Sequence, residues 1–107
     1  AVETVPIIVI KKDKSRETFD RNKLLKSFLR ACDKRKISID TLEKVVDDIE
    51  AKLQNLLDRE VTSTLIGEYA MEALKEIDEV AYVRFAAVYR AFDTLDQFIN
   101  EIETLNS

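Results

Sequence analysis

Apolar residues recur at intervals of three and four over most of this sequence, and this spacing limits its fold more than any other feature. The first such stripe consists of Leu24, Leu25, Phe28, Leu29 and Cys32. Residues three and four apart share one face of an α-helix, so the stripe predicts a helix over about residues 21–33 with that face in the core. The sequence contains one glycine and one proline, which leaves few breaks and favours a mainly helical chain.

Four further helices are predicted after this one, three of them preceded by a residue that can cap a helix. Ser38 precedes a helix of about twenty residues, Thr62 precedes the next, and Asp78 precedes a fourth. A last helix over residues 95–105 has an apolar stripe that can dock on the domain or on a second copy. Their apolar residues include Leu42, Val45, Val46, Ile49, Leu53, Leu56, Leu57, Leu65, Ile66, Tyr69, Ala70, Ala73, Leu74, Ile77, Phe98, Ile99, Ile102 and Leu105.

The residues before the first helix predict a β-hairpin. Side chains alternate along a strand, so Val9 and Lys11 lie on one face and Ile10 and Lys12 on the other. A turn at residues 13–14 and a return strand over residues 15–19 complete the hairpin. Asp20 then caps the helix, and Phe19 and Leu24 have the spacing of a hydrophobic staple across the helix start.

Basic side chains are expected to meet where the hairpin joins the helix. One of Lys11 and Lys12 faces this junction, Lys23 lies in the first helical turn, and free backbone N–H groups lie beside them. Such a group suits an anion, phosphate above all. A lysine-rich hairpin with a solvated face needs no ligand, and this structural alternative stays open.

The length of 107 residues predicts one domain. The hairpin and the helices that follow it predict the α+β class, mainly helical, with a short N-terminal β-hairpin on a bundle of four to five helices. Its expected parts are a lead-in over residues 1–6, the hairpin over 7–19, a helical body over 20–92 and a C-terminal helix over 93–107.

Charge is distributed unevenly along the chain. Residues 1–36 contain eleven Lys or Arg and five acids, whereas residues 37–107 contain six Lys or Arg and sixteen acids. A basic end on an acidic body is poorly suited to coating a nucleic-acid duplex and better suited to a small polyanion. The basic run at residues 34–36 has a structural alternative, because cations stabilise the negative end of a helix.

The composition also excludes several kinds of site. There is no histidine and only one cysteine, Cys32, so one chain can form no internal disulfide, no Cys/His zinc site and no histidine-based triad. Cys32 is expected in the core. Apolar runs are too short to cross a membrane and the N-terminus lacks the features of a signal peptide, so a cytoplasmic location without membrane contact is expected.

The hairpin and first helix resemble the opening of the ATP-cone, a regulatory nucleotide-binding domain with the pattern V-x-K-R-D-G, a glutamate, then F-D-x-x-K. The matching residues are Val9, Lys11, Lys12, Asp13, Glu17, Phe19, Asp20 and Lys23. Lys12 stands where arginine is usual, which keeps the charge and loses the planar fork. Lys14 stands where glycine is usual, so a left-handed turn there would be strained.

A second block makes the resemblance more specific. V-T-S-x-x-I-G over residues 61–67 and A-Y-V-R-F-A-x-V-Y-R-x-F over residues 81–92 are similar to the ATP-cone of the NrdR family, bacterial repressors of ribonucleotide reductase genes. Members of that family also carry a DNA-contacting zinc ribbon with four cysteines, which this sequence does not contain. We therefore expect no zinc and no direct DNA binding by this chain alone.

The resemblance implies a regulatory domain that binds ATP or dATP without hydrolysis, with magnesium possible through the phosphates, and whose oligomeric state depends on the nucleotide. A homo-oligomer is expected. Lys11, Lys12 and Lys23 would bind phosphates, and Glu17 the ribose or the base amino group. The residues expected to form the adenine wall and to close the pocket are Val9, Phe19, Leu24, Thr62 and Tyr89.

Two other classes of protein are alternatives to this interpretation. A helical association module that has lost nucleotide binding is the main alternative, supported by the departures at Lys12 and Lys14. An enzyme is not expected, because the sequence has no phosphate-binding glycine loop, no histidine and no paired acids of the kind that have perturbed pKa values.

Overall fold

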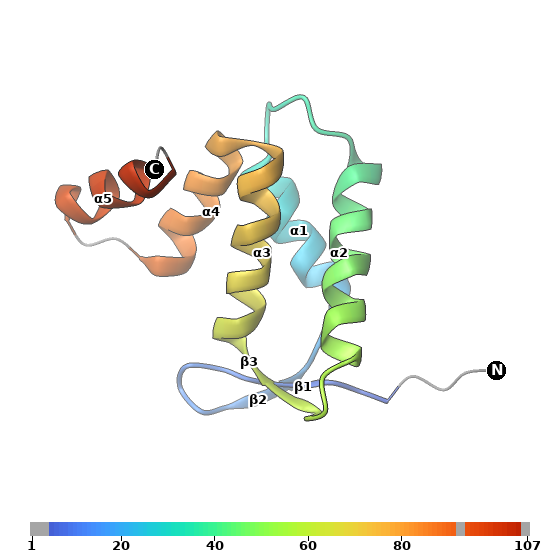
Figure 1. Ribbon diagram of the computed structural model, residues 1–107. Coiled ribbons are helices and arrows are strands. Elements are labelled where there is room, and N and C mark those ends of the chain that lie inside the picture. Colours follow the sequence, from blue (N-terminus) through green and yellow to red (C-terminus); the bar gives the residue numbers. More distant parts are fainter. Residues whose placement is uncertain (1–4, 92–93, 106–107) are drawn as a thin grey trace.

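A computed structural model describes residues 5–91 and 94–105 of the chain. Its elements are β1 (Ile8–Ile10), β2 (Arg16–Thr18), α1 (Arg21–Ala31), α2 (Ile39–Gln54), β3 (Glu60–Thr62), α3 (Ser63–Ile77), α4 (Glu79–Arg90) and α5 (Leu95–Leu105). Four helices stand on a small sheet, and α5 lies to one side next to α4 (Figure 1). The predicted α+β, mainly helical fold is confirmed. The predicted lead-in and the junction at residues 92–93 fall partly or wholly outside the described residues.

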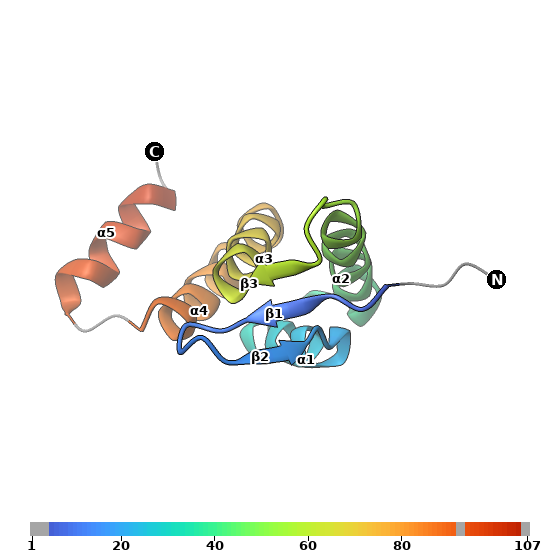
Figure 2. The same ribbon diagram turned by 90° about the horizontal axis from the view of Figure 1, so that it is seen from below.

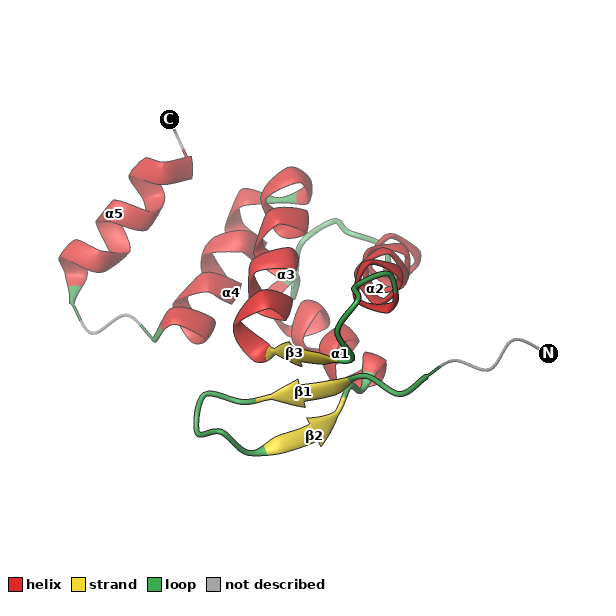
Figure 3. Ribbon diagram, turned by 60° about the horizontal axis from the view of Figure 1, so that its bottom comes forward, coloured by secondary structure: helices red, strands yellow, loops and turns green. Residues whose placement is uncertain are grey.

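The sheet contains a strand that the sequence did not predict. The strand order is β2-β1-β3, with β1 antiparallel to β2 and parallel to β3 (Figure 3). Val9 in the middle strand lies opposite Glu17 on one side and Val61 on the other. The sequence predicts at residues 59–63 only the start of a helix, with Thr62 as its cap. The backbone of this segment pairs with β1 as well, and Ile8 N–H also donates to the carbonyl oxygen of Arg59 at 2.9 Å.

The hairpin turn contains one residue with left-handed backbone geometry, at the position where ATP-cones usually have glycine. Lys14 N–H donates to the carbonyl oxygen of Lys11 at 2.9 Å, and Lys11 N–H donates to that of Ser15 at 2.8 Å. Lys14 itself has a φ of 73°. A residue with a Cβ is strained in this region of backbone space, so the turn is formed at some cost in free energy.

Four predicted helix caps are confirmed. The side chains of Asp20, Ser38, Thr62 and Asp78 accept hydrogen bonds from backbone N–H groups in the first turns of α1, α2, α3 and α4. These contacts satisfy donors that have no partner within the helix. The predicted starts of these helices are correct because a cap is a local interaction between residues two or three positions apart.

Helix α2 is shorter than the twenty residues predicted. It ends at Gln54, and Leu57 is fully exposed in the following turn. Arg59 donates through Nη1 to the carbonyl oxygen of Gln54 at 3.1 Å, which satisfies a backbone acceptor at the helix end. The chain leaves the helix here because residues 60–62 must reach β1.

The core lies between the first four helices and the sheet. Helix α1 contacts α2 and α4, and α3 contacts the same two helices. The sheet lies across one end of the helices, with β3 in front of α3 and β2 in front of α1 (Figure 2), and it adds Val9 and Val61 to the core. Cys32 is buried as predicted, and this burial raises the pKa of its thiol. The largest fully buried side chains are Phe28, Leu42, Val46, Leu53 and Leu74.

No helix among the described residues is long and apolar enough to span a membrane.

A buried carboxylate joins α5 to α4. Glu101 is only 5% exposed. Tyr82 Oη donates to its Oε1 at 2.5 Å, and Arg90 Nη1 donates to its Oε2 at 2.8 Å. Both carboxylate oxygens therefore have partners, as a buried charge requires. Burial and the hydrogen bond to Glu101 raise the pKa of Tyr82 to about 12.

Replacing Tyr82 with phenylalanine tests this contact. Tyr82→Phe leaves one buried carboxylate oxygen without its donor and should lower the free energy of unfolding by about 1–3 kcal/mol at neutral pH. The raised pKa of Tyr82 stabilises the folded state fully below about pH 10, and that stabilisation is lost as the pH rises towards 12. Denaturant unfolding between pH 7 and 12 should therefore show a smaller decline for Tyr82→Phe than for the wild type.

Tyr69→Phe is the matched control, because it removes a phenol from α3 and leaves the contact with Glu101 in place. A decline above pH 10 that is the same in Tyr82→Phe and in the wild type would contradict the assignment.

Replacing Lys14 with glycine should relieve the turn. Glycine adopts a positive φ without steric cost, so Lys14→Gly should raise the free energy of unfolding by about 0.5–1 kcal/mol. Lys26→Gly, within α1, should lower it by about 1 kcal/mol. Thermal unfolding of both variants gives the comparison, and a destabilised Lys14→Gly would contradict this account of the turn.

Candidate functional site

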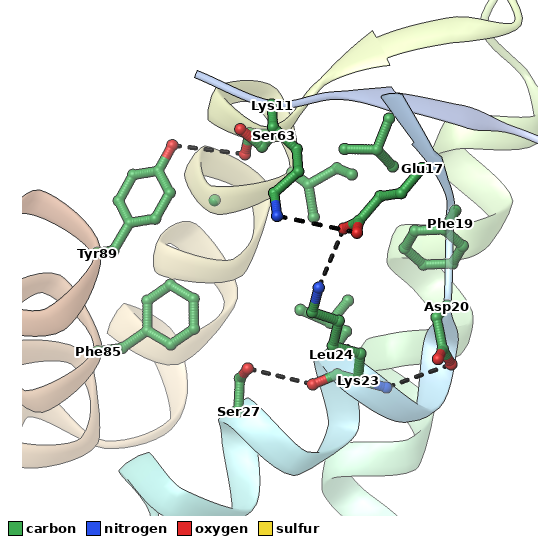
Figure 4. Close-up of a pocket in the computed structure, with 13 residues that line it drawn as sticks. Lys11, Glu17, Phe19, Asp20, Lys23, Leu24, Ser27, Ser63, Phe85 and Tyr89 are labelled. Carbon is green, nitrogen blue, oxygen red and sulfur yellow. Dashed lines mark hydrogen bonds and ion pairs between the residues drawn. The ribbon is translucent and has the colours of Figure 1, made fainter. Parts of the chain in front are cut away.

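A cavity of about 290 Å³ lies between the sheet and helices α1, α3 and α4. Residues from five elements or their ends contribute side chains to it, and Figure 4 shows how they surround the space. Its lining consists of Val9, Lys11, Glu17, Phe19, Asp20, Lys23, Leu24, Ser27, Ser63, Ile66, Gly67, Phe85 and Tyr89. The cavity thus has both charged and apolar walls, as ligand pockets commonly do.

The hairpin supplies one side of the cavity. Val9 on β1 is buried and faces it, and Lys11 lies just beyond the end of that strand. Glu17 on β2 is the antiparallel partner of Val9 and points to the same side. Because side chains alternate along the strand, Lys11 shares the face of Val9. The packing of that face against the helices then decides between the two candidate lysines: Lys11 lines the cavity and Lys12 does not.

The start of α1 supplies the second side. Asp20 accepts hydrogen bonds from the backbone N–H groups of Asn22 and Lys23 at 2.9 and 3.4 Å, which holds the first helical turn in place. Lys23 and Leu24 then line the cavity, together with Phe19 from the residue before the cap. Of the two predicted staple residues, Leu24 belongs to the core and Phe19 packs against it.

Helices α3 and α4 close the cavity through one tyrosine. A Cβ on Gly67 would lie 2.1 Å from Cε1 of Tyr89, so only glycine lets this ring lie against α3. Tyr89 Oη donates to the carbonyl oxygen of Thr64 at 3.0 Å, and its ring stacks on Phe85 with centroids 6.0 Å apart. The close approach of this ring to α3 therefore depends on the single glycine of the sequence.

Opposite charges meet inside the cavity. Lys23 Nζ lies 3.1 Å from Glu17 Oε1, and Lys11 Nζ lies 3.9 Å from Glu17 Oε2 (Figure 4). All three side chains are partly exposed. One carboxylate thus holds two amines from different parts of the chain near the same point, where a polyanion can reach them.

The structure brings most of the predicted site residues together. Seven of the nine line the cavity, and they are Val9, Lys11, Glu17, Phe19, Lys23, Leu24 and Tyr89. Lys12 lies outside it, with Nζ 4.9 Å from the centroid of the Tyr89 ring. Thr62 is also not in the lining. Its hydroxyl oxygen accepts from Leu65 N–H at 3.1 Å and so caps α3, the structural alternative for this residue.

The sequence did not identify several residues of the lining. Ser63 follows the predicted Thr62 and takes its place at the cavity, while Ser27, Ile66 and Phe85 come from the faces of three helices. Ser27 lies one helical turn after Lys23, and Ile66 lies one turn after the cap Thr62. Helical spacing from these two residues could therefore have indicated them. Phe85 lies one turn before Tyr89, and the same reasoning applies to it.

Arg84 has a structural role at another helix end. Its Nη1 donates to the carbonyl oxygens of Ala31 and Asp33 at 3.2 and 2.7 Å, at the C-terminal end of α1.

Within residues 5–91 and 94–105, no group of three or more His, Cys, Asp or Glu residues is arranged to hold a metal ion.

Comparisons with known proteins agree with the resemblance noted in the sequence. The family model described as "ATP cone domain" matches residues 7–95. A protein named "Transcriptional repressor NrdR" from Acetivibrio thermocellus is 61% identical over 104 residues, which cover 97% of this chain and 69% of that protein. Proteins of the same name from Thermoanaerobacter sp. and Clostridium tetani are 52% and 51% identical.

This chain spans about two thirds of the length of these relatives: 66% of the Thermoanaerobacter protein and 68% of the Clostridium protein. The matched region includes the hairpin, α1, α3 and α4, which together form the cavity. The chain therefore belongs to the ATP-cone family, in the branch represented by the NrdR transcriptional repressors.

Proposed function

We propose that this chain is the regulatory domain of a transcriptional repressor and that it binds ATP or dATP in the cavity between hairpin, α1, α3 and α4. The observation that carries the proposal is the meeting of two lysine amines, from Lys11 and Lys23, beside an apolar wall. Amines bind phosphates and an apolar wall accepts a base, so the two halves of the cavity match the two halves of a nucleotide.

The residue roles follow from position. Lys11 and Lys23 contact the phosphates, and magnesium enters with the phosphates. Val9, Phe19 and Leu24 form the wall for adenine, and Tyr89 closes the cavity from α4. Ligand pockets commonly span roughly 300–1,000 Å³. The cavity is near the lower end of this range, at about 290 Å³, so part of the nucleotide extends through its mouth.

Three further residues act only after a side chain moves or through a neighbouring residue: Glu17, Lys12 and Thr62. Glu17 accepts a hydrogen bond from the ribose or the base amino group once the lysines turn to the phosphates. Lys12 lies over Tyr89 and reaches the phosphates only by leaving that ring. Thr62 acts through the start of α3, since its cap places Ser63 at the cavity.

Binding without hydrolysis is part of the proposal. Enzymes that transfer phosphoryl groups surround the phosphates with a glycine-rich loop and position a group that orients the attacking water. The sequence has a single glycine, Gly67, and it lies within α3 under the Tyr89 ring. Glu17, the acid nearest the amines, is already paired with them.

Nucleotide identity changes how copies of the chain associate, because the cavity and an exposed apolar surface share α4. Val88, next to Tyr89, is 84% exposed, and Leu95 and Ile99 on α5 are also exposed. Exposed apolar groups of this kind are common at contacts between proteins. A ligand that moves Tyr89 therefore also moves this surface.

Replacing Lys23 with alanine tests the binding site. Lys23→Ala removes one charged hydrogen bond to phosphate and should weaken ATP and dATP binding by about 1.5–3 kcal/mol. Isothermal titration calorimetry with magnesium present gives the measurement. Lys26→Ala, one turn further along α1, is the control because Lys26 does not line the cavity.

Equal weak heats for the wild type and Lys23→Ala would contradict the site and would favour a helical association module without nucleotide binding. Free phosphate measured in the same samples after several hours should not increase, and a steady release would contradict binding without hydrolysis.

Light scattering tests the effect on association. The mass of the wild type should differ between samples with ATP, with dATP and without nucleotide, because each ligand positions Tyr89 differently. At nucleotide concentrations that saturate only the wild type, Lys23→Ala should keep one mass in all three samples. An unchanged mass of the wild type in all three samples would contradict the effect of the nucleotide on association and would leave only nucleotide binding.

A further inference from the structure

Glu17 occupies the position between the two amines that are proposed to bind phosphate. Its Oε1 is 3.1 Å from Lys23 Nζ and its Oε2 is 3.9 Å from Lys11 Nζ, so the two ends of one carboxylate serve two cations (Figure 4). Glu17 lies on β2, Lys11 follows β1 and Lys23 is on α1. Three separate parts of the chain are therefore needed to build this arrangement.

An incoming phosphate has to compete with this carboxylate. Both are anions, and at separations of a few ångströms they repel each other while attracting the same amines. The side chain of Glu17 is 40% exposed and that of Lys23 is 63% exposed, so solvent weakens these forces without removing them. A phosphate group without a nucleoside is therefore attracted by two ammonium groups and repelled by one carboxylate.

A nucleotide differs from a bare polyphosphate in what it offers Glu17. A carboxylate can only accept hydrogen bonds. The ribose hydroxyls and the adenine amino group are donors, whereas the oxygens of a polyphosphate at neutral pH are mainly acceptors. The nucleoside part can therefore make a favourable contact with Glu17, and an inorganic polyphosphate cannot.

We propose that Glu17 is a specificity-determining residue that disfavours inorganic polyphosphate and admits phosphates that are joined to a hydrogen-bond donor. This inference rests on the proposed nucleotide site and adds a repulsive element to it. Specific binding sites commonly combine attraction for the right ligand with repulsion of the wrong one. The lysines alone would not make this distinction, since any polyphosphate satisfies the amines. The apolar wall attracts a base but does not repel a ligand that lacks one.

The experiment compares two ligands on two proteins. Sodium tripolyphosphate and ATP are titrated by calorimetry, at constant ionic strength, into the wild type and Glu17→Gln. Glutamine keeps the shape of the side chain and removes the charge. Tripolyphosphate should bind Glu17→Gln about three- to tenfold more tightly than the wild type, while ATP should gain less, so that the preference for ATP falls.

Two further variants separate specificity from net charge. Glu43→Gln removes one negative charge from the exposed side of α2, away from the cavity, and should leave tripolyphosphate binding unchanged. Glu17→Asp retains the carboxylate and should retain the low affinity for tripolyphosphate. Glu17→Thr, which suits an edge strand, repeats the neutral substitution if Glu17→Gln does not fold.

The possible outcomes are distinguishable. Tripolyphosphate binding that is unchanged or weaker in Glu17→Gln, or equally strengthened in Glu43→Gln, overturns the role of Glu17 and leaves the nucleotide site standing if ATP binds the wild type. Tighter tripolyphosphate binding in Glu17→Gln without any ATP binding supports the repulsion and overturns the nucleotide site. No heat with either ligand on any variant overturns both.

Discussion

The pairing of β1 with β3 is the contact on which the candidate site depends. It is parallel, it joins residues about fifty positions apart, and it sets Val9 beside Val61. Because β3 continues directly into α3, this pairing brings the start of α3 to the end of β1 where Lys11 lies. Without it β1 would have one partner, β2, and the cavity would lack the side formed by Ser63, Ile66 and Gly67.

Charge compensation organises the interior of that cavity. Two ammonium groups would repel each other if they shared a cavity alone, and Glu17 makes their approach favourable. The same carboxylate then becomes part of what a ligand must displace. Pre-organisation and competition would thus come from one residue. Under the proposal above, one local ion pair both builds the site and limits which anions enter it.

Helix α4 connects the cavity to the last helix through neighbouring residues. Tyr89 lies over Gly67, and Arg90 reaches both Glu68 on α3 at 3.8 Å and the buried Glu101 on α5 at 2.8 Å. The residue that closes the cavity is therefore the immediate neighbour of the residue that holds α5. Helices usually move as rigid units, so a shift in the end of α4 is passed to whatever packs on it.

The sequence by itself determined the helices, their caps, the hairpin and the family, because helical spacing and caps are interactions between residues a few positions apart. It also identified seven residues of the cavity, six from the segment around the motif that places Val9, Glu17 and Lys23 in order and Tyr89 through the motif over residues 81–92. Only the tertiary structure decided the third strand, since three residues with one buried side chain have no recognisable period until β1 pairs with them. It also decided that Lys11 and not Lys12 faces the cavity, that Ser63 rather than Thr62 lines it, and that Glu17 joins two lysines. These features depend on elements distant in the sequence meeting in space, which local patterns do not specify.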